Sequence, residues 1–111
     1  MKEHTPDKWV VVKIINDVDV VYKVFGCWDG GYLASDSWQI NSGITEVTEE
    51  KEHWLFKGYS GSIYKCKKGC YGVHSYGWTI LSNYIAKAKD EGVDMIEMPE
   101  KTDWKDISYE L

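Results

Sequence analysis

The chain lacks arginine altogether, and its segment 53–89 lacks aspartate and glutamate. The absence of arginine removes the planar fork that binds phosphate and guanine in a bidentate manner. Codon usage in an AT-rich genome accounts for this absence without a functional cause. The net charge of −5 also argues against simple non-specific DNA binding, which depends on an excess of basic residues. We expect no sequence-specific DNA binding.

Long apolar runs are also missing. The longest, Val10-Val11-Val12, is interrupted by Lys13, so no transmembrane helix is predicted. Residues 1–7 lack the apolar stretch of a signal peptide. The odd number of cysteines, three, agrees with a reducing compartment. We therefore expect a protein of the cytoplasm with no membrane partner.

The acid-free segment 53–89 is the most informative feature of the sequence. Its six lysines give it a formal charge of +6 and leave −11 for the rest of the chain. It also contains Gly58-Tyr59-Ser60-Gly61-Ser62-Ile63-Tyr64, which combines flexible backbone, hydroxyl groups and aromatic rings. This mixture suits an anionic, nucleotide-like ligand, although it is equally compatible with an ordinary β-hairpin.

Hydrophobic periodicity predicts six strands and one amphipathic helix. Segment 32–43 is open between a short strand and an ordered loop. Residues 1–7 are expected to be frayed, and the acidic tail 100–111 is expected to dock through Trp104 and Ile107. The predicted strands are 9–15, 20–28, 44–48, 53–57, 62–66 and 93–98, and the helix is 78–91.

This order of elements predicts one α+β domain over residues 1–111. We expect a mostly antiparallel sheet of five to seven strands, with one C-terminal amphipathic helix on one face. The opposite face then needs water, a ligand or a partner chain to cover it. A homo-oligomer is one solution.

The predicted ligand site lies on both sides of the Ser60-Gly61 turn. Backbone amides of the turn can form a small anion nest, nearby lysines supply charge, and aromatic rings can stack on a base. Alternatively, the aromatic residues fill the core and the lysines face solvent. The candidate ligand-binding residues are Trp38, Tyr59, Ser60, Gly61, Ser62, Tyr64, Lys65 and Lys67.

Metal binding and catalysis are the weaker alternatives. Cys66, Cys70 and His74 offer three possible zinc ligands, with Cys27 or His53 as a fourth, but their spacing differs from that of a zinc knuckle. Ser60, Ser62, His74 and Asp36 include the residue types of a hydrolase without its strand–turn–helix elbow. We expect no cofactor and no assigned catalytic residue.

The acidic C-terminal segment carries a separate hypothesis. Residues 90–111 contain eight acidic side chains and two lysines. With Trp104 and Tyr109, this segment could bind the basic surface of another protein or mimic the charge of a nucleic acid. A solvated, acidic face is the simpler interpretation.

Two segments resemble a family of small uncharacterised proteins of tailed phages. They are Asp36-Ser37-Trp38-Gln39-Ile40-Asn41-Ser42-Gly43-Ile44 and Gly58-Tyr59-Ser60-Gly61-Ser62-Ile63-Tyr64-Lys65-Cys66. In that family a Trp-containing segment leads into a Ser-Gly-Ser-aromatic strand, and the similarity spans roughly residues 28–72.

The resemblance implies a bacteriophage origin, and it assigns no activity or site residue. We therefore expect a non-enzymatic accessory protein acting against host defence in the host cytoplasm, by sequestering a nucleotide-like signal. The alternatives are an inhibitor of a host defence protein and a small enzyme or metal-binding protein.

Overall fold

Eight strands in two sheets and one long helix make up the protein in the computed structural model, which describes residues 2–28, 37–73 and 75–109. The elements follow the chain as β1 (Glu3–His4), β2 (Lys8–Ile15), β3 (Val20–Trp28), β4 (Ser37–Ile40), β5 (Ile44–Glu49), β6 (His53–Gly58), β7 (Ile63–Lys67), the short 3-10 helix η1 (Lys68–Cys70), α1 (Ser75–Asp90) and β8 (Asp94–Glu97).

The strands form a central sheet, β4-β3-β2-β8, and an outer sheet, β1-β7-β6-β5. All pairs are antiparallel except β1 with β7. The predicted α+β class is confirmed. The number of strands slightly exceeds the predicted five to seven, because the two-residue strand β1 lies in a segment that was expected to be frayed. Strand β4 falls in segment 32–43, which was open between a short strand and a loop, and the strands divide between two sheets.

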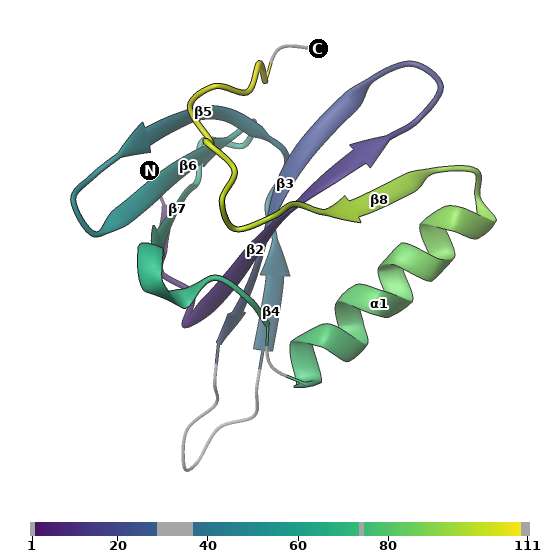
Figure 1. The fold of residues 1–111 in the computed structure, drawn as a ribbon, viewed down its shortest axis with the longest axis horizontal. Coiled ribbons are helices and arrows are strands. Elements are labelled where there is room, and N and C mark those ends of the chain that lie inside the picture. The colour runs from purple at the N-terminus through teal and green to yellow at the C-terminus, as the bar shows by residue number, and fades with distance from the viewer. Residues whose placement is uncertain (1, 29–36, 74, 110–111) are drawn as a thin grey trace.

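The central sheet is covered on both faces, by α1 on one side and the outer sheet on the other (Figure 1). Along β2, Val10 and Val12 pack toward α1, whereas Trp9 and Val11 pack toward the outer sheet. Successive side chains of a strand point to opposite faces, so a continuous apolar run is required here. The face that was expected to need a ligand or partner is thus covered by the chain itself.

Local sequence signals place several boundaries. The side chain of Asn16 accepts hydrogen bonds from the amides of Val18 and Asp19 and closes the β2–β3 turn, as predicted. Gly92 ends α1 with φ of +79°, and the amide of Val93 bonds back to the helix. The helix begins at residue 75, three residues before its predicted start.

Both chain ends described by the structure are packed. The N-terminal residues were expected to be frayed, but Glu3 and His4 pair with β7 and Pro6 is buried. The C-terminal segment crosses from β8 toward the outer sheet (yellow in Figure 1). Its Trp104 is only 1% exposed in the core between the sheets, and Ile107 packs beside that core, so the predicted docking is confirmed.

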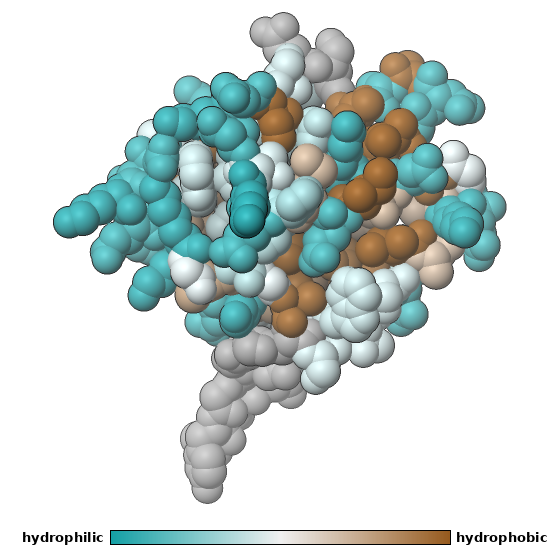
Figure 2. Space-filling model, viewed as in Figure 1, coloured by the Kyte–Doolittle hydropathy of each residue, from teal (hydrophilic) through white to brown (hydrophobic). Residues whose placement is uncertain are grey.

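Surface hydrophobicity is unevenly distributed. On the face shown in Figure 2, hydrophobic side chains gather over β8 and along the side of α1 that lies next to it. Within the described part of the chain, no helix is both long and apolar enough to cross a membrane.

Candidate functional site

The structure distributes the predicted ligand-binding residues over four places. Trp38 lies on the face of the central sheet that α1 covers. Tyr64 is buried between the sheets, and residues 59–62 connect β6 to β7. Lys65 and Lys67 alternate with the buried residues of β7 and so project from the opposite face of the outer sheet. These residues do not converge on one ligand.

The turn that was expected to form an anion nest uses its amides internally. The amide of Ser60 donates to Ser42 Oγ over 3.0 Å, and the amide of Gly61 donates to the carbonyl oxygen of Gly58 over 2.9 Å. The Ser60 and Ser62 hydroxyl oxygens lie 3.4 Å apart. Because these bonds close the turn, the amides of Ser60 and Gly61 are not available to an anion.

The two tyrosines beside this turn differ in accessibility. Tyr64 is 3% exposed, its ring lies 4.9 Å from that of His4, and burial raises the pKa of its hydroxyl. Tyr59 is 51% exposed and packs over Gly43, where even a Cβ would meet the tyrosine ring at 2.9 Å. Only Tyr59 retains ring surface that a ligand could contact.

Acidic residues of β5 and of the turn that follows it lie beside two lysines of the acid-free segment. Lys65 Nζ lies 4.0 Å from a carboxylate oxygen of Glu50. Lys57 is paired in register with Glu46. The segment is acid-free along the sequence, but its neighbour in the outer sheet is not. The positive charges of Lys57 and Lys65 are therefore each offset by an acidic neighbour in the folded chain.

Glu49 anchors the C-terminal segment to the outer sheet. Its carboxylate accepts from Lys105 Nζ at 2.8 Å and from Lys68 Nζ at 2.5 Å. The hydrogen bonds from Lys105 and then Lys68 lower the pKa of Glu49 from 4.5 to about 2. Lys68 also lies over the Trp54 ring, 5.1 Å from its centroid. This exposed cluster joins β5, η1 and the tail.

Replacing Glu49 by glutamine should make the melting temperature of the protein depend less on pH in the acidic range. A carboxyl with a depressed pKa contributes stability above its unfolded pKa of 4.5, and loses it as the pH falls toward about 2. The melting temperature of E49Q should lie below that of the parent at pH 7, and the two should converge near pH 2. The difference should shrink in high salt, because the cluster is exposed.

Glu52→Gln is the matched control, since Glu52 forms no ion pair with any residue that the structure describes. Thermal melts from pH 2 to 7 would measure both variants. Parallel curves for E49Q and the parent across that range would contradict the role of Glu49.

The possible zinc ligands that the structure describes do not form one metal-binding group. Cys66 is fully buried between the sheets, and burial raises the pKa of its thiol well above the ordinary value, which disfavours the thiolate that binds metal. Cys27 lies on the other side of the central sheet. His74 and Asp36 fall outside the described residues. Among the residues described, no three His, Cys, Asp or Glu side chains form a metal-binding group.

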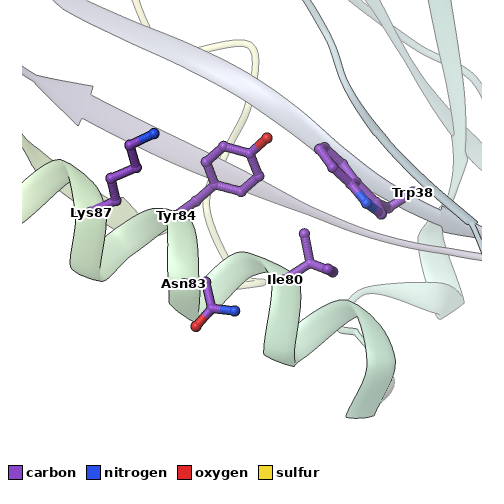
Figure 3. A pocket seen from close by; sticks show the side chains of 5 residues that line it. All are labelled: Trp38, Ile80, Asn83, Tyr84 and Lys87. Atoms are coloured by element: carbon purple, nitrogen blue, oxygen red, sulfur yellow. The ribbon is translucent and has the colours of Figure 1, made fainter.

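A hollow of about 320 Å³ opens between α1 and β4. Trp38 stacks one face on buried Phe25, with ring centroids 5.6 Å apart and planes at 14°. Tyr84 meets Trp38 edge-on at 5.4 Å. The indole is thereby held as a rigid aromatic wall. The hollow is lined by Trp38, Ile80, Asn83, Tyr84 and Lys87 (Figure 3).

A second hollow, also about 320 Å³, continues along α1. It shares Tyr84 and Lys87 with the first, and Figure 3 shows the Tyr84 ring between Lys87 and Trp38. Neither Lys23 nor Lys87 forms an ion pair with a described residue. The other residues that line the second hollow are Ile14, Lys23, Ile40, Ala88, Glu91 and Met95. We call the two hollows together the α1 groove.

The groove follows from where α1 rests on the central sheet. Only residues 91–93 separate α1 from β8, so the end of the helix must stay near that edge. Leu81 and Met95 join the core beneath it. The other half of the face, formed by β3 and β4, is left incompletely covered.

Sequence reasoning identified Trp38 but assigned it the wrong neighbours. From the sequence, Tyr84 lies on the apolar face of the predicted helix and Lys87 is one of the six lysines of the acid-free segment, and neither is a predicted site residue. One available signal was Lys23, which occupies an inward-facing position of β3, two residues before buried Phe25. A lysine on an apolar strand face indicates an opening to solvent above it.

Comparison of the chain with protein-family models, with curated proteins and with solved structures yields no match. The functional argument therefore depends on the chemistry of the groove.

Proposed function

We propose that the protein binds a small, planar, anionic molecule of the nucleotide class in the α1 groove, without chemical conversion. The observation that carries this proposal is one rigid aromatic wall, Trp38 against Phe25, beside two lysines with no ion-pair partner among the described residues. A base stacked on an aromatic side chain contributes about 1–3 kcal/mol. Lys23 and Lys87 supply charge for a phosphate, and the Asn83 amide can recognise a base edge.

The lining residues favour binding over turnover. The described lining contains no serine, cysteine or histidine that could act as a nucleophile or as a general base of neutral pH. The excess of lysine over glutamate in the groove contrasts with the net charge of −5 of the chain. An anion is therefore attracted locally although the whole protein repels it.

In a cell, we propose that this binding sequesters a nucleotide-like signal of host defence. This role combines the groove with the bacteriophage origin that the sequence resemblance implies. The site of action would be the host cytoplasm. The groove replaces the β6–β7 turn as the proposed binding place, and Trp38 is the residue common to both hypotheses.

Inhibition of a basic host protein is the second candidate, and one observation favours it. All seven acidic side chains from residue 90 to residue 106 are exposed, and none forms an ion pair within the described chain. The aromatic residues expected to assist are engaged, however. Trp104 is in the core, and Tyr109 donates a hydrogen bond to the Trp104 carbonyl.

Isothermal titration against a panel of linear and cyclic nucleotides tests the binding proposal. Trp38→Ala should weaken binding by about 5- to 150-fold, the equivalent of one stacked base. Lys87→Met should weaken it less, and the loss should diminish with salt because the contact is exposed. Trp78→Ala and Lys89→Met are matched controls from the same helix, outside both hollows.

The same titration separates the competing sites. Loss of binding in Tyr59→Ala and Lys65→Ala, with W38A unchanged, would return the site to the β6–β7 turn. No heat with any nucleotide would contradict the proposal. Salt-sensitive capture of a host protein, unaffected by W38A, would support the second candidate instead.

A further inference from the structure

The α1 groove is divided into two parts of equal size by residues that belong to both. Each hollow has a volume of about 320 Å³, and Tyr84 and Lys87 line each of them. A volume of this size lies at the lower end of the range of about 300–1,000 Å³ that is typical of small-molecule sites. A ligand confined to one hollow would leave the other as unfilled apolar surface.

From this division we infer that the ligand has two ring systems joined by one internal phosphodiester, as in a dinucleotide. The inference rests on the proposed function and specifies its ligand class. One ring would stack on Trp38 in the first hollow. The second ring would lie on the apolar floor made by Ile40 and Met95, and the Tyr84 ring contributes to both parts.

Charge along the groove positions the phosphate. Lys87 stands at the junction of the hollows, and Lys23 lies in the second. The phosphodiester that joins the two rings would therefore lie beside Lys87. Lys23 would lie in the second hollow, beside the second nucleoside. Attraction between the negative phosphodiester and these two lysines favours this position of the ligand in the groove.

The second hollow also contains an element of discrimination. Glu91 lines it together with Lys23, and Glu91 forms no ion pair with a described residue. A terminal phosphate on the second nucleoside would bring two more negative charges toward this carboxylate. Repulsion of that kind selects against the wrong ligand. The groove should prefer a dinucleoside monophosphate to a dinucleotide with an additional terminal phosphate.

Calorimetric titration of the intact protein with adenylyl-adenosine, adenosine monophosphate and adenylyl-adenosine phosphorylated at both its 5′ and 3′ ends tests the inference. Adenylyl-adenosine should bind at least about tenfold more tightly than the mononucleotide, because a second base adds its own stacking contribution. The doubly phosphorylated form carries a terminal phosphate on whichever nucleoside occupies the second hollow. It should bind more weakly than adenylyl-adenosine, and Glu91→Gln should reduce that difference.

Single-residue variants show which of the two hollows contributes to the binding of each probe. Trp38→Ala should weaken both adenylyl-adenosine and the mononucleotide. Lys23→Met should weaken adenylyl-adenosine more than it weakens the mononucleotide, because Lys23 lines only the second hollow. Lys89→Met, on the same helix but outside both hollows, should alter neither.

The outcomes separate this inference from the function on which it rests. Equal affinity for adenylyl-adenosine and the mononucleotide, or dinucleotide binding that is insensitive to K23M, would overturn the two-part ligand and leave nucleotide binding intact. Binding of none of the three probes would overturn both.

Discussion

Replacing Trp104 by alanine is expected to lower the free energy of unfolding by about 3–5 kcal/mol, the usual cost of truncating a buried tryptophan. Trp104 is 1% exposed, and its ring centroid lies 6.0–6.2 Å from those of Tyr71, Phe56 and Trp9. Removing it opens a cavity between the two sheets. The loss is large against the 5–15 kcal/mol of total stability typical of a small domain.

The cavity would also release the C-terminal segment. The Trp104 side chain is the largest buried group of the tail, and the hydroxyl of Tyr109 donates to the Trp104 carbonyl over 2.6 Å. Two further anchors remain. Ile107 packs beside the core, and the exposed ion pair of Lys105 with Glu49 contributes little by itself. The tail should become accessible to protease in W104A.

Urea unfolding followed by far-ultraviolet circular dichroism would measure this effect without relying on tryptophan emission. Trp78→Ala is the matched control, because Trp78 is 48% exposed on α1. Trp78→Ala should change the free energy of unfolding by no more than about 0.5 kcal/mol, as for most surface substitutions. Equal unfolding midpoints for W104A and W78A would contradict the assignment of Trp104 to the core.

Gly77→Ala is expected to destabilise the protein, although the same change in an ordinary helix interior is favourable by about 0.5–1 kcal/mol. Gly77 is buried in the first turn of α1, and a Cβ there would lie 2.3 Å from Cys27 Sγ. Real contacts of this kind are not that short, so the helix or β3 must move. Overpacking of a core typically costs about 1–3 kcal/mol.

A double-mutant cycle with Cys27→Ala isolates this contact. Removing the sulfur leaves the Cys27 Cβ 3.7 Å from the new methyl group, which is an ordinary packing distance. Gly77→Ala should therefore be neutral or stabilising in the C27A background, and the coupling energy should be of the order of the clash. Stabilisation of the parent protein by G77A alone would show that α1 and β3 are not in such close contact.

This contact also matters for the groove. Gly77 lets α1 approach β3 at its N-terminal end, and α1 supplies one wall of both hollows. A helix displaced by the clash would shift Tyr84 relative to Trp38. G77A should consequently weaken nucleotide binding as well as stability, and C27A/G77A should recover part of both.

Most secondary structure was predictable because local signals and burial agree. The alternating and continuous apolar patterns of β2 and β3, the Asn16 turn and the Gly92 helix end were all readable along the chain. The short strands β1 and β4 were not assigned with the same certainty. Their pairing partners are distant in sequence, and two to four residues carry too little periodicity to identify a strand.

The binding site was predicted less well, for an identifiable reason. Ser60, Gly61 and Tyr64 have the composition of a ligand loop, but closing the turn and filling the core consume their polar groups and ring surface. Trp38 stacks on Phe25 and meets Tyr84 edge-on, and it still lines the first hollow. Composition alone cannot distinguish a polar group that is already bonded from one that is open.

The sequence by itself determined the α+β class, the main strands, the helix and the burial of Trp104, because these depend on local periodicity and hydrophobicity. Its locally acid-free segment also suggested the anionic, nucleotide-like ligand that stands here as a proposal. Only the tertiary structure decided which charges remain unpaired. Strand pairing sets Glu46 of β5 beside Lys57 and brings Glu50, in the turn after β5, to 4.0 Å from Lys65. The position of α1 over β8 instead leaves Lys23 and Lys87 beside an open hollow. Those contacts join residues far apart in the chain, and no local pattern records them.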